Sequence, residues 1–400
     1  MTLSQLETDF LAILRAALAG EPAEPESGDY EGLFSLAGEQ KLLPFVYEAL
    51  HEGGAAGQNP ALFAGARMQV RNQVLNQTMR SAAFRELYGQ MRQAGLHPVV
   101  VKGQLCSRLY PKEDFRLSGD DDLWLPEEEV VPCHDFLVGR GLVTQTPEEE
   151  LAQKGEISYR DPRGPLHLEV HRRLFDEEDG TQDLNEPFEE GLRHPVETQG
   201  FLSLAPQDHL LYLILHAYKH FVLRGVGIRQ LCDIGLWAGA YFAEVDWAAL
   251  RAACKKTRSL GFAAAAFGIC RVYLGMDLPL PDPWTETPPL EPLCHDALDG
   301  GIYGSADGDR LHASTLTRNA VRSSRQGKKK LPLATAFPPL GYLVDQYPYL
   351  RRHPGLLPWA WAQRLGRYAA GIRKEDNSPA GAVKLAQERM ALLKLYGVME

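Results

Sequence analysis

The sequence predicts an α+β fold in which a small mixed β-sheet is flanked by an N-terminal and a C-terminal helical domain. Apolar residues recur every three or four positions up to about residue 95 and again from about residue 206, which is the helical period. Between these regions lie short β-branched or alternating runs that are typical of strands. At 400 residues the chain is longer than one core usually serves. We therefore expect domains over residues 1–95, 96–200 and 201–400.

The composition is that of a compact globular protein, with 44% hydrophobic and 24% charged residues. A formal net charge of −10 argues against non-specific binding to nucleic acid, although it leaves room for local basic patches. Six dispersed cysteines without a CxxC pair predict free thiols. Because the chain also shows no secretory signal and no apolar stretch of about 18 residues, we expect a cytoplasmic protein without a membrane span. Oligomeric state is not predicted.

The first region contains three helical patterns. They read LETDFLAILRAAL, LLPFVYEAL and VRNQVLNQTMRSAAFRELYGQMRQAG, and the last ends at a glycine suited to a helix C-terminus.

The central region alternates strands and helices. HPVVVKG predicts a buried strand that ends at Gly103, followed by a short helix at 104–110, a strand at 121–125 and a helix at 127–140. GLVTQT, EISYRD and PLHLEVHR predict three further strands.

The last region returns to helices. Pro206 and Asp208 give the start signals of the first one. Residues 300–340 are rich in Gly, Ser and Lys and predict a loop or linker.

Three consecutive carboxylates in RLSGDDDLWL (116–125) are the main functional signal. On a strand, Asp120 and Asp122 point to one face and Asp121 to the other. Glu169 in HLEVH would join the pair if its strand lies beside the first. Converging carboxylates repel unless a cation neutralises them, and oxygen ligands of this kind suit Mg²⁺ or Mn²⁺. Such an arrangement is what two-metal nucleotidyl transfer requires.

Each of these residues also has a structural interpretation. The triplet alone fits a solvated turn or a helix cap, and Glu169 alone fits a strand residue paired with an arginine. Lys102 and Arg116 could contact phosphate or form ion pairs within the protein. Gly103, between a strand and a helix, would let phosphate approach the backbone.

Two histidine patterns suggest zinc. His167, Glu169 and His171 share one strand face and are competent zinc ligands. In HAYKH, His216 and His220 have metalloprotease spacing, but Ala217 stands where those enzymes carry a glutamate. Lys219, His220 and Arg229 either reach phosphates or serve packing and surface roles.

The quoted motifs resemble the bacterial uncharacterised nucleotidyltransferase family of the polymerase-β-type superfamily. The resemblance covers VKG (101–103), YP (110–111), RLSGDDDLWL and HLEVH (167–171), and extends to HAYKH, IRQLCDIGLW (228–237) and YPYLRRHPGLLPWAW. It implies that Asp120 and Asp122 are the two metal-binding aspartates, that Glu169 is the third acidic residue and that Gly103 approaches the triphosphate. The chain departs from the superfamily in Gln104, where serine is common, and in Asp121, where an apolar residue is usual.

We therefore predict a Mg²⁺- or Mn²⁺-dependent nucleotidyltransferase that uses an NTP such as ATP. Asp120, Asp122 and Glu169 would bind metal and act in catalysis, and Lys102, Gly103, Arg116 and His171 would contact the nucleotide. The acceptor is not identified, and its candidates are a small molecule such as an aminoglycoside or a sugar, a protein side chain and, less favoured by the acidic charge, a nucleic-acid end. The alternatives are a non-catalytic nucleotide-binding regulatory module and a zinc hydrolase.

Overall fold

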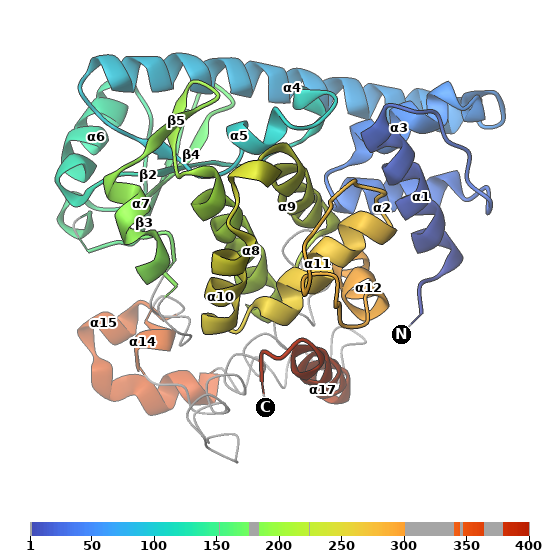
Figure 1. Cartoon of the computed structure of the whole chain (residues 1–400). Coiled ribbons are helices and arrows are strands. Elements are labelled where there is room, and N and C mark those ends of the chain that lie inside the picture. The colour runs from blue at the N-terminus through green and yellow to red at the C-terminus, as the bar shows by residue number, and fades with distance from the viewer. Residues whose placement is uncertain are drawn as a thin grey trace.

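The computed structural model describes residues 2–151, 153–175, 184–223, 225–300, 340–344, 347–363 and 379–399. The predicted loop near 300–340 lies almost entirely outside these residues. The described chain is an α+β structure in which helices flank a small sheet region, as predicted (Figure 1).

The N-terminal region consists of α1 (Gln5–Ala19), α2 (Tyr30–Glu39), α3 (Leu43–Glu52) and the long α4 (Pro60–Gln93). At 1.5 Å per residue, the 34 residues of α4 extend about 50 Å. Figure 1 shows α4 running from the first three helices to the sheet at the other end of the molecule. Its buried face carries apolar residues at both ends, including Phe63 and Phe84. One helix therefore supports both the N-terminal helices and the sheet.

The main sheet of the described chain has four strands in the order β1-β2-β4-β3. They are β1 (Val99–Val100), β2 (Asp121–Trp124), β3 (Glu156–Arg160) and β4 (His167–His171). β2 and β4 are parallel neighbours, whereas β1 pairs with β2 and β3 pairs with β4 in antiparallel fashion. The predicted mixed sheet is confirmed, and the parallel pair places the ends of β2 and β4 side by side.

Two parts of the strand prediction differ from the structure. GLVTQT forms only an isolated bridge between Val143 and Arg160, because a side-chain turn in which Thr144 accepts from the Thr146 amide follows directly. A second sheet, β5 (Val196–Thr198) with β6 (Phe201–Ser203), was not predicted. Its two-residue turn has positive φ at Gln199 (53°) and Gly200 (81°), which is the geometry of a tight hairpin.

Further helices surround the sheet and build the C-terminal region. Around the sheet lie α5 (Gln104–Ser107), α6 (Glu127–Gly139) and α7 (Glu189–Arg193). The C-terminal helices are α8 (Pro206–Leu223), α9 (Ile228–Ala240), α10 (Trp247–Lys256), α11 (Leu260–Val272), α12 (Glu291–Asp299), α14 (Leu340–Leu343), α15 (Tyr349–Arg352) and α17 (Pro379–Leu395). Short 3₁₀ turns cover Ala55–Gly57, Glu113–Phe115, Glu148–Glu150, Glu186–Phe188, Phe242–Glu244 and Pro354–Leu356.

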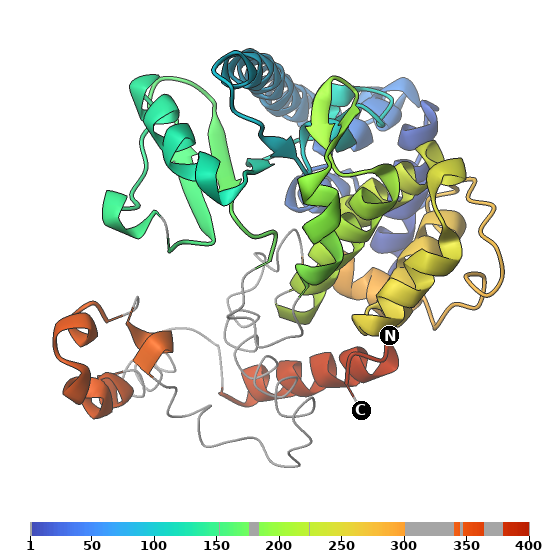
Figure 2. The ribbon, with the colours of Figure 1, turned by 60° about the vertical axis from the view of Figure 1, so that its left-hand side comes forward.

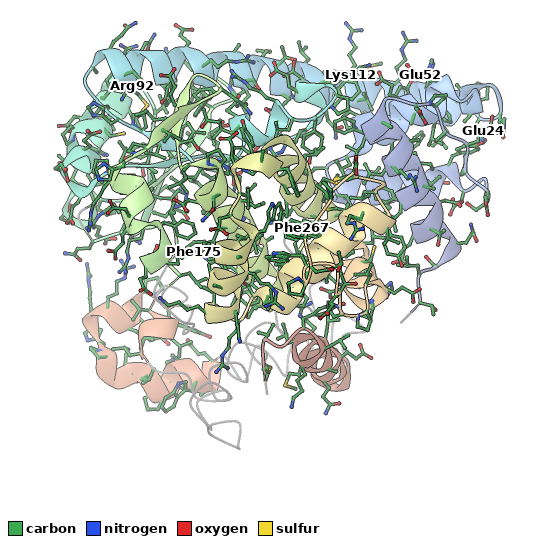
Figure 3. The ribbon with its side chains drawn as sticks, viewed as in Figure 1. Glu24, Glu52, Arg92, Lys112, Phe175 and Phe267 are labelled. Atoms are coloured by element: carbon green, nitrogen blue, oxygen red, sulfur yellow. The ribbon has the colours of Figure 1, made fainter. Side chains whose placement is uncertain are left out.

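A continuous apolar core connects all three predicted regions. It includes Phe10 of α1, Leu123 of β2, Val170 of β4 and Phe267 of α11, each at most 1% exposed. Figure 3 shows Phe267 in the interior, with Arg92, Lys112 and Glu52 on the outer surface. Figure 2 shows α14 and α15 set apart from this body, and they have a small apolar cluster of their own around Leu350.

All six cysteines are buried and unpaired, so the predicted free thiols are confirmed. Across the described residues, no helix is long and apolar enough to cross a membrane.

Candidate functional site

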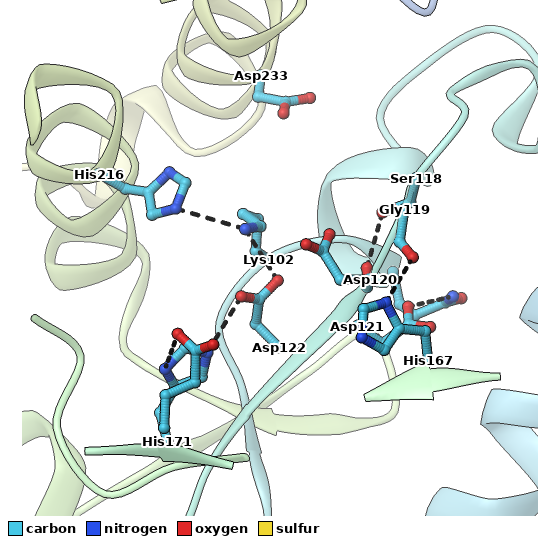
Figure 4. Close-up of polar contacts among 12 residues, drawn as sticks. Lys102, Ser118, Gly119, Asp120, Asp121, Asp122, His167, His171, His216 and Asp233 are labelled. Atoms are coloured by element: carbon cyan, nitrogen blue, oxygen red, sulfur yellow. Dashed lines mark hydrogen bonds and ion pairs between the residues drawn. The ribbon is translucent and has the colours of Figure 1, made fainter. Parts of the chain in front are cut away.

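The register of β2 and β4 brings two predicted carboxylates together. Asp122 lies opposite Glu169, and Trp124 lies opposite His171. One potential ligand atom from each of Asp122, Glu169 and His171 lies within 4.8 Å of the other two. Figure 4 shows the Asp120 and Asp122 carboxyl groups on one side of β2 and the Asp121 carboxyl group on the other. This is the alternation predicted for a strand.

Asp122 is buried between two cationic groups. Its Oδ2 lies 2.9 Å from Lys102 Nζ, and its Oδ1 accepts a hydrogen bond from His171 Nε2 at 3.2 Å. Burial alone would raise the pKa of Asp122, but Lys102 and His171 outweigh burial and lower it. Asp122 is therefore ionised at neutral pH.

Glu169 has the opposite electrostatic situation. Burial, followed by repulsion from Asp122 and Asp120, raises its pKa to about 7. Glu156 adds to the shift, and Lys102 opposes it only weakly. Glu169 therefore carries most of the uncompensated repulsion, and a cation bound beside it would relieve that repulsion.

His171 lies between acidic groups. Nε2 bonds Asp122, while Nδ1 lies 3.8 Å from Glu156. Burial would lower the pKa of His171, but Asp122 and the other carboxylates raise it overall. The imidazole can thus orient Asp122 as a cation, or bind a metal once it is neutral.

α8 brings two histidines to the opposite side of Lys102. The Lys102 ammonium donates to His216 Nε2 at 3.4 Å, which Figure 4 shows, and the Nε2 atoms of His216 and His220 are also 3.4 Å apart. Burial, Lys102 and His220 lower the pKa of His216 well below its usual value, so the ring is neutral and can accept. HAYKH therefore contributes to the environment of Lys102.

Asp121, the middle carboxylate of the triplet, has structural partners on the other face of β2. It is 1% exposed, and its oxygens accept from Arg80 Nε at 2.8 Å and Gln104 Nε2 at 3.0 Å. Burial raises the pKa of Asp121, and Arg80 and Gln104 counteract this effect. Arg80 also donates to the carbonyl oxygens of Ser118 and His167. Asp121 therefore ties α4 to the sheet.

Gly103 occupies a backbone conformation that favours glycine. Its φ is 59°, and a Cβ atom there would lie 3.4 Å from Asp121 Oδ1. This turn connects the end of β1 to α5 and places Lys102 and Gln104 on their respective carboxylates.

Arg116 forms a buried ion pair within the protein, which is one of the two roles that the sequence suggested for it. Nε and Nη2 donate to Asp233 of α9 at 2.7 and 2.6 Å, and Tyr110 donates to the same carboxylate at 2.8 Å. Arg116 is 1% exposed. Its guanidinium joins the loop before β2 to α9, which favours the structural role over nucleotide contact.

The zinc site suggested for His167, Glu169 and His171 is not formed, because His167 has other partners. His167 Nε2 bonds Ser158 Oγ at 2.8 Å and Nδ1 bonds the Gly119 carbonyl at 3.2 Å, so both ring nitrogens are engaged outside the acidic group. Among the described residues, the group that could hold an ion consists of Asp122, Glu169 and His171.

This donor set fits a divalent cation. Two carboxylates suit Mg²⁺ and Mn²⁺, and an imidazole broadens the set toward transition metals. The predicted ligands were Asp120, Asp122 and Glu169. The structure brings Asp122 and Glu169 together and adds His171, which had been assigned to nucleotide contact, while Asp120 lies close enough to affect the pKa of Glu169.

Arg80 and Asp233 were not identified from the sequence. The separation of Asp121 from Arg80 is 41 residues, and that of Arg116 from Asp233 is 117 residues. The only available signal was that a buried carboxylate at Asp121 needs a basic partner.

A family model described as uncharacterised nucleotidyltransferase matches residues 26–275, which is more than half of the chain. The match includes Gly103, the β2 carboxylates, Glu169 and the histidines of α8. No curated protein and no solved structure matches the chain. By the extent of this match, together with the motifs it contains, the chain belongs to the uncharacterised nucleotidyltransferase family.

Proposed function

We propose that this protein transfers a nucleoside monophosphate from an NTP to an acceptor and releases pyrophosphate. In this reaction an acceptor oxygen bonds to the α-phosphorus, the bond to the bridging oxygen of the β-phosphate breaks, and the acceptor proton passes to water. Family membership supports the reaction class. The acceptor is a small molecule or a protein side chain.

The observation that carries this proposal is the pairing of Asp122 with Glu169 on parallel strands. In this place burial, followed by repulsion from Asp122 and Asp120, raises the pKa of Glu169 to about 7. Asp120 on the same side of β2 adds a third negative charge. Asp122 is paired with Lys102 and His171, whereas Glu169 has no such close cationic partner among the described residues, and Mg²⁺ or Mn²⁺ bound with an NTP would compensate its charge.

Asp122, Glu169 and His171, with Asp120, would hold the cation. When bound, it would neutralise phosphate charge and lower the pKa of the acceptor hydroxyl. Lys102 is held by Asp122 and His216, and an ammonium in this position can bind a phosphate oxygen of the NTP. Gly103 forms the turn that carries Lys102, and we propose that phosphate approaches the backbone there.

The ion pair between Lys102 and Asp122 favours one alternative, a nucleotide-binding regulatory module without catalysis. An internal ammonium 2.9 Å from Asp122 Oδ2 compensates part of the acidic charge in place of a metal. A module of this kind would bind NTP and release no pyrophosphate.

The test combines binding with turnover. Calorimetric titration of NTP and Mg²⁺ or Mn²⁺ measures binding, while a screen of labelled NTPs against cell extract seeks a nucleotidylated product together with released pyrophosphate. We expect both signals from the wild type and neither product nor pyrophosphate from Glu169→Gln. Asp135→Asn removes an exposed carboxylate of α6 and should keep full activity.

Binding without pyrophosphate release across all NTPs and acceptors would favour the module. Activity of Glu169→Gln equal to that of the wild type would contradict the mechanism proposed here.

A further inference from the structure

Lys41 reaches the acidic site from the N-terminal helices. It lies in the connection between α2 and α3, 79 positions before Asp120 in the chain. A Cβ atom placed on Gly119 would lie 3.3 Å from Lys41 Nζ, so the ammonium is beside the residue that precedes Asp120. Asp120 is also the negative group that raises the pKa of Lys41, which confirms their proximity.

The backbone at Lys41 is unusual for a lysine. α2 ends with two bonds, from the Lys41 amide to the Gly38 carbonyl and from the Leu42 amide to the Ala37 carbonyl. This is the arrangement in which the residue after the helix adopts a left-handed conformation, and glycine is the usual residue there. Lys41 has a φ of 55°. A side chain at this position costs stability relative to glycine, and that cost suggests a role for the side chain.

Gln40 fixes the position of this turn. It is fully buried, and its amide donates to the carbonyls of Ala297 and Leu298 at 2.9 and 3.0 Å. Its carbonyl oxygen accepts from the Ile228 amide at 2.9 Å. The turn that carries Lys41 is thereby held against α9 and α12.

Three cationic side chains and one carboxylate have the largest charge effects on the pKa of Lys41. Burial lowers its pKa first, followed by repulsion from Arg229, and Arg80 and Lys102 add to the effect. Arg80 has Asp121 as a partner and Lys102 has Asp122. Asp233, whose pKa is lowered by Arg116 and then by Arg229, is already paired with Arg116. Among the described residues, Asp120 is the carboxylate with the largest charge effect on Lys41.

Two of these cations keep unused hydrogen-bonding capacity. In the described part of the chain, the Lys41 ammonium makes no hydrogen bond or ion pair. Arg229 is 4% exposed, and its Nε has no acceptor among the described residues. A buried donor such as Arg229 Nε normally has a partner, and an anionic ligand beside the half-buried Lys41 would supply one.

We propose that Lys41 binds the β- and γ-phosphates of the NTP, the part of the substrate that leaves as pyrophosphate. This inference rests on the proposed function and deepens it. It makes the N-terminal helical segment a component of the nucleotide site. Ligands that contain a diphosphate should depend on Lys41, whereas a nucleoside monophosphate should not.

The experiment measures affinity for NTP, pyrophosphate and NMP, each with Mg²⁺, by calorimetry. For Lys41→Met we expect affinity for NTP and pyrophosphate to fall about 10-fold, as for loss of a charge-assisted hydrogen bond, with NMP affinity unchanged. Lys41→Arg should retain most of the affinity. Lys154→Met removes an exposed lysine and serves as the matched control.

Lys41→Gly separates binding from folding. Because glycine suits the left-handed backbone, this variant should be at least as resistant to thermal unfolding as the wild type, yet bind NTP as weakly as Lys41→Met. If the wild type binds NTP, and Lys41→Met and Lys41→Gly bind it as tightly as the wild type does, the role of Lys41 is refuted while the proposed function stands. If the wild type binds neither NTP nor pyrophosphate, the proposed function itself fails.

Discussion

Asp122 and Glu169 face each other across two parallel strands, yet their pKa values shift in opposite directions. Lys102 and His171 lower the pKa of Asp122, whereas burial and the neighbouring carboxylates raise that of Glu169 to about 7. The pair therefore contains one compensated and one uncompensated carboxylate. Without a bound cation, ionised Glu169 opposes folding.

The first prediction concerns the pH dependence of stability in Glu169→Gln. The folded-state pKa of Glu169 is raised from 4.5 to about 7, so its contribution to stability is greatest below pH 4.5 and is lost as the pH rises through 7. Because Glu169 is partly exposed, solvent screening reduces the free energy that corresponds to this pKa shift. We expect Glu169→Gln to be more stable than the wild type at pH 8 by about 2 kcal/mol. The difference should vanish near pH 4.5.

Urea denaturation without divalent cations, repeated from pH 4.5 to 8, measures this difference. Asp135→Asn, in which an exposed carboxylate is neutralised, controls for the general change in net charge. A wild type that is more stable than Glu169→Gln at pH 8 would show that Glu169 has a stabilising partner.

The second prediction contrasts the adjacent residues Asp120 and Asp121. Asp121→Asn leaves the buried Arg80 without its counter-charge, and we expect it to lower the free energy of unfolding by about 3 kcal/mol. Asp120→Asn changes a partly exposed group, so we expect a stability change within about 0.5 kcal/mol. Its loss of pyrophosphate release should be about 100-fold.

Thermal unfolding and pyrophosphate release, both measured on Asp120→Asn and Asp121→Asn, test this contrast. Equal loss of stability in both variants would mean that Asp120 is as structural as Asp121.

The third prediction concerns Arg116 and Asp233. Arg116→Met removes the group that, against the effect of burial, lowers the pKa of Asp233, and it leaves a buried carboxylate poorly compensated. We expect a loss of about 3 kcal/mol in the free energy of unfolding. Arg116→Met with Asp233→Leu should recover most of this loss, because both charges are then absent.

Urea denaturation of the two single variants and the double variant gives their coupling. NTP affinity of the double variant should equal that of the wild type. A large loss of NTP affinity in the folded double variant would show that Arg116 contributes to nucleotide binding.

The sequence predicted the parts of the site that depend on local pattern. Alternation along β2 placed Asp120 and Asp122 on one face, and the motif around Glu169 gave the neighbouring strand. The partners of Asp121 and Arg116 were not predictable, because they come from α4 and α9 and local periodicity carries no information about such distant contacts. The β5–β6 hairpin was missed because its strands have only three residues each. Lys41 was missed because a single lysine between two helices has no pattern.

The length of α4 has a consequence for how the molecule moves. Arg80 attaches this helix to Asp121, while Phe63, toward the other end, packs with aromatic rings of α2 and α3. A hinge between the N-terminal helices and the sheet would have to bend a continuous helix or break a buried ion pair. We therefore expect these two parts to behave as a single rigid block, with any adjustment to an incoming substrate confined to side-chain rotamers on either side of it.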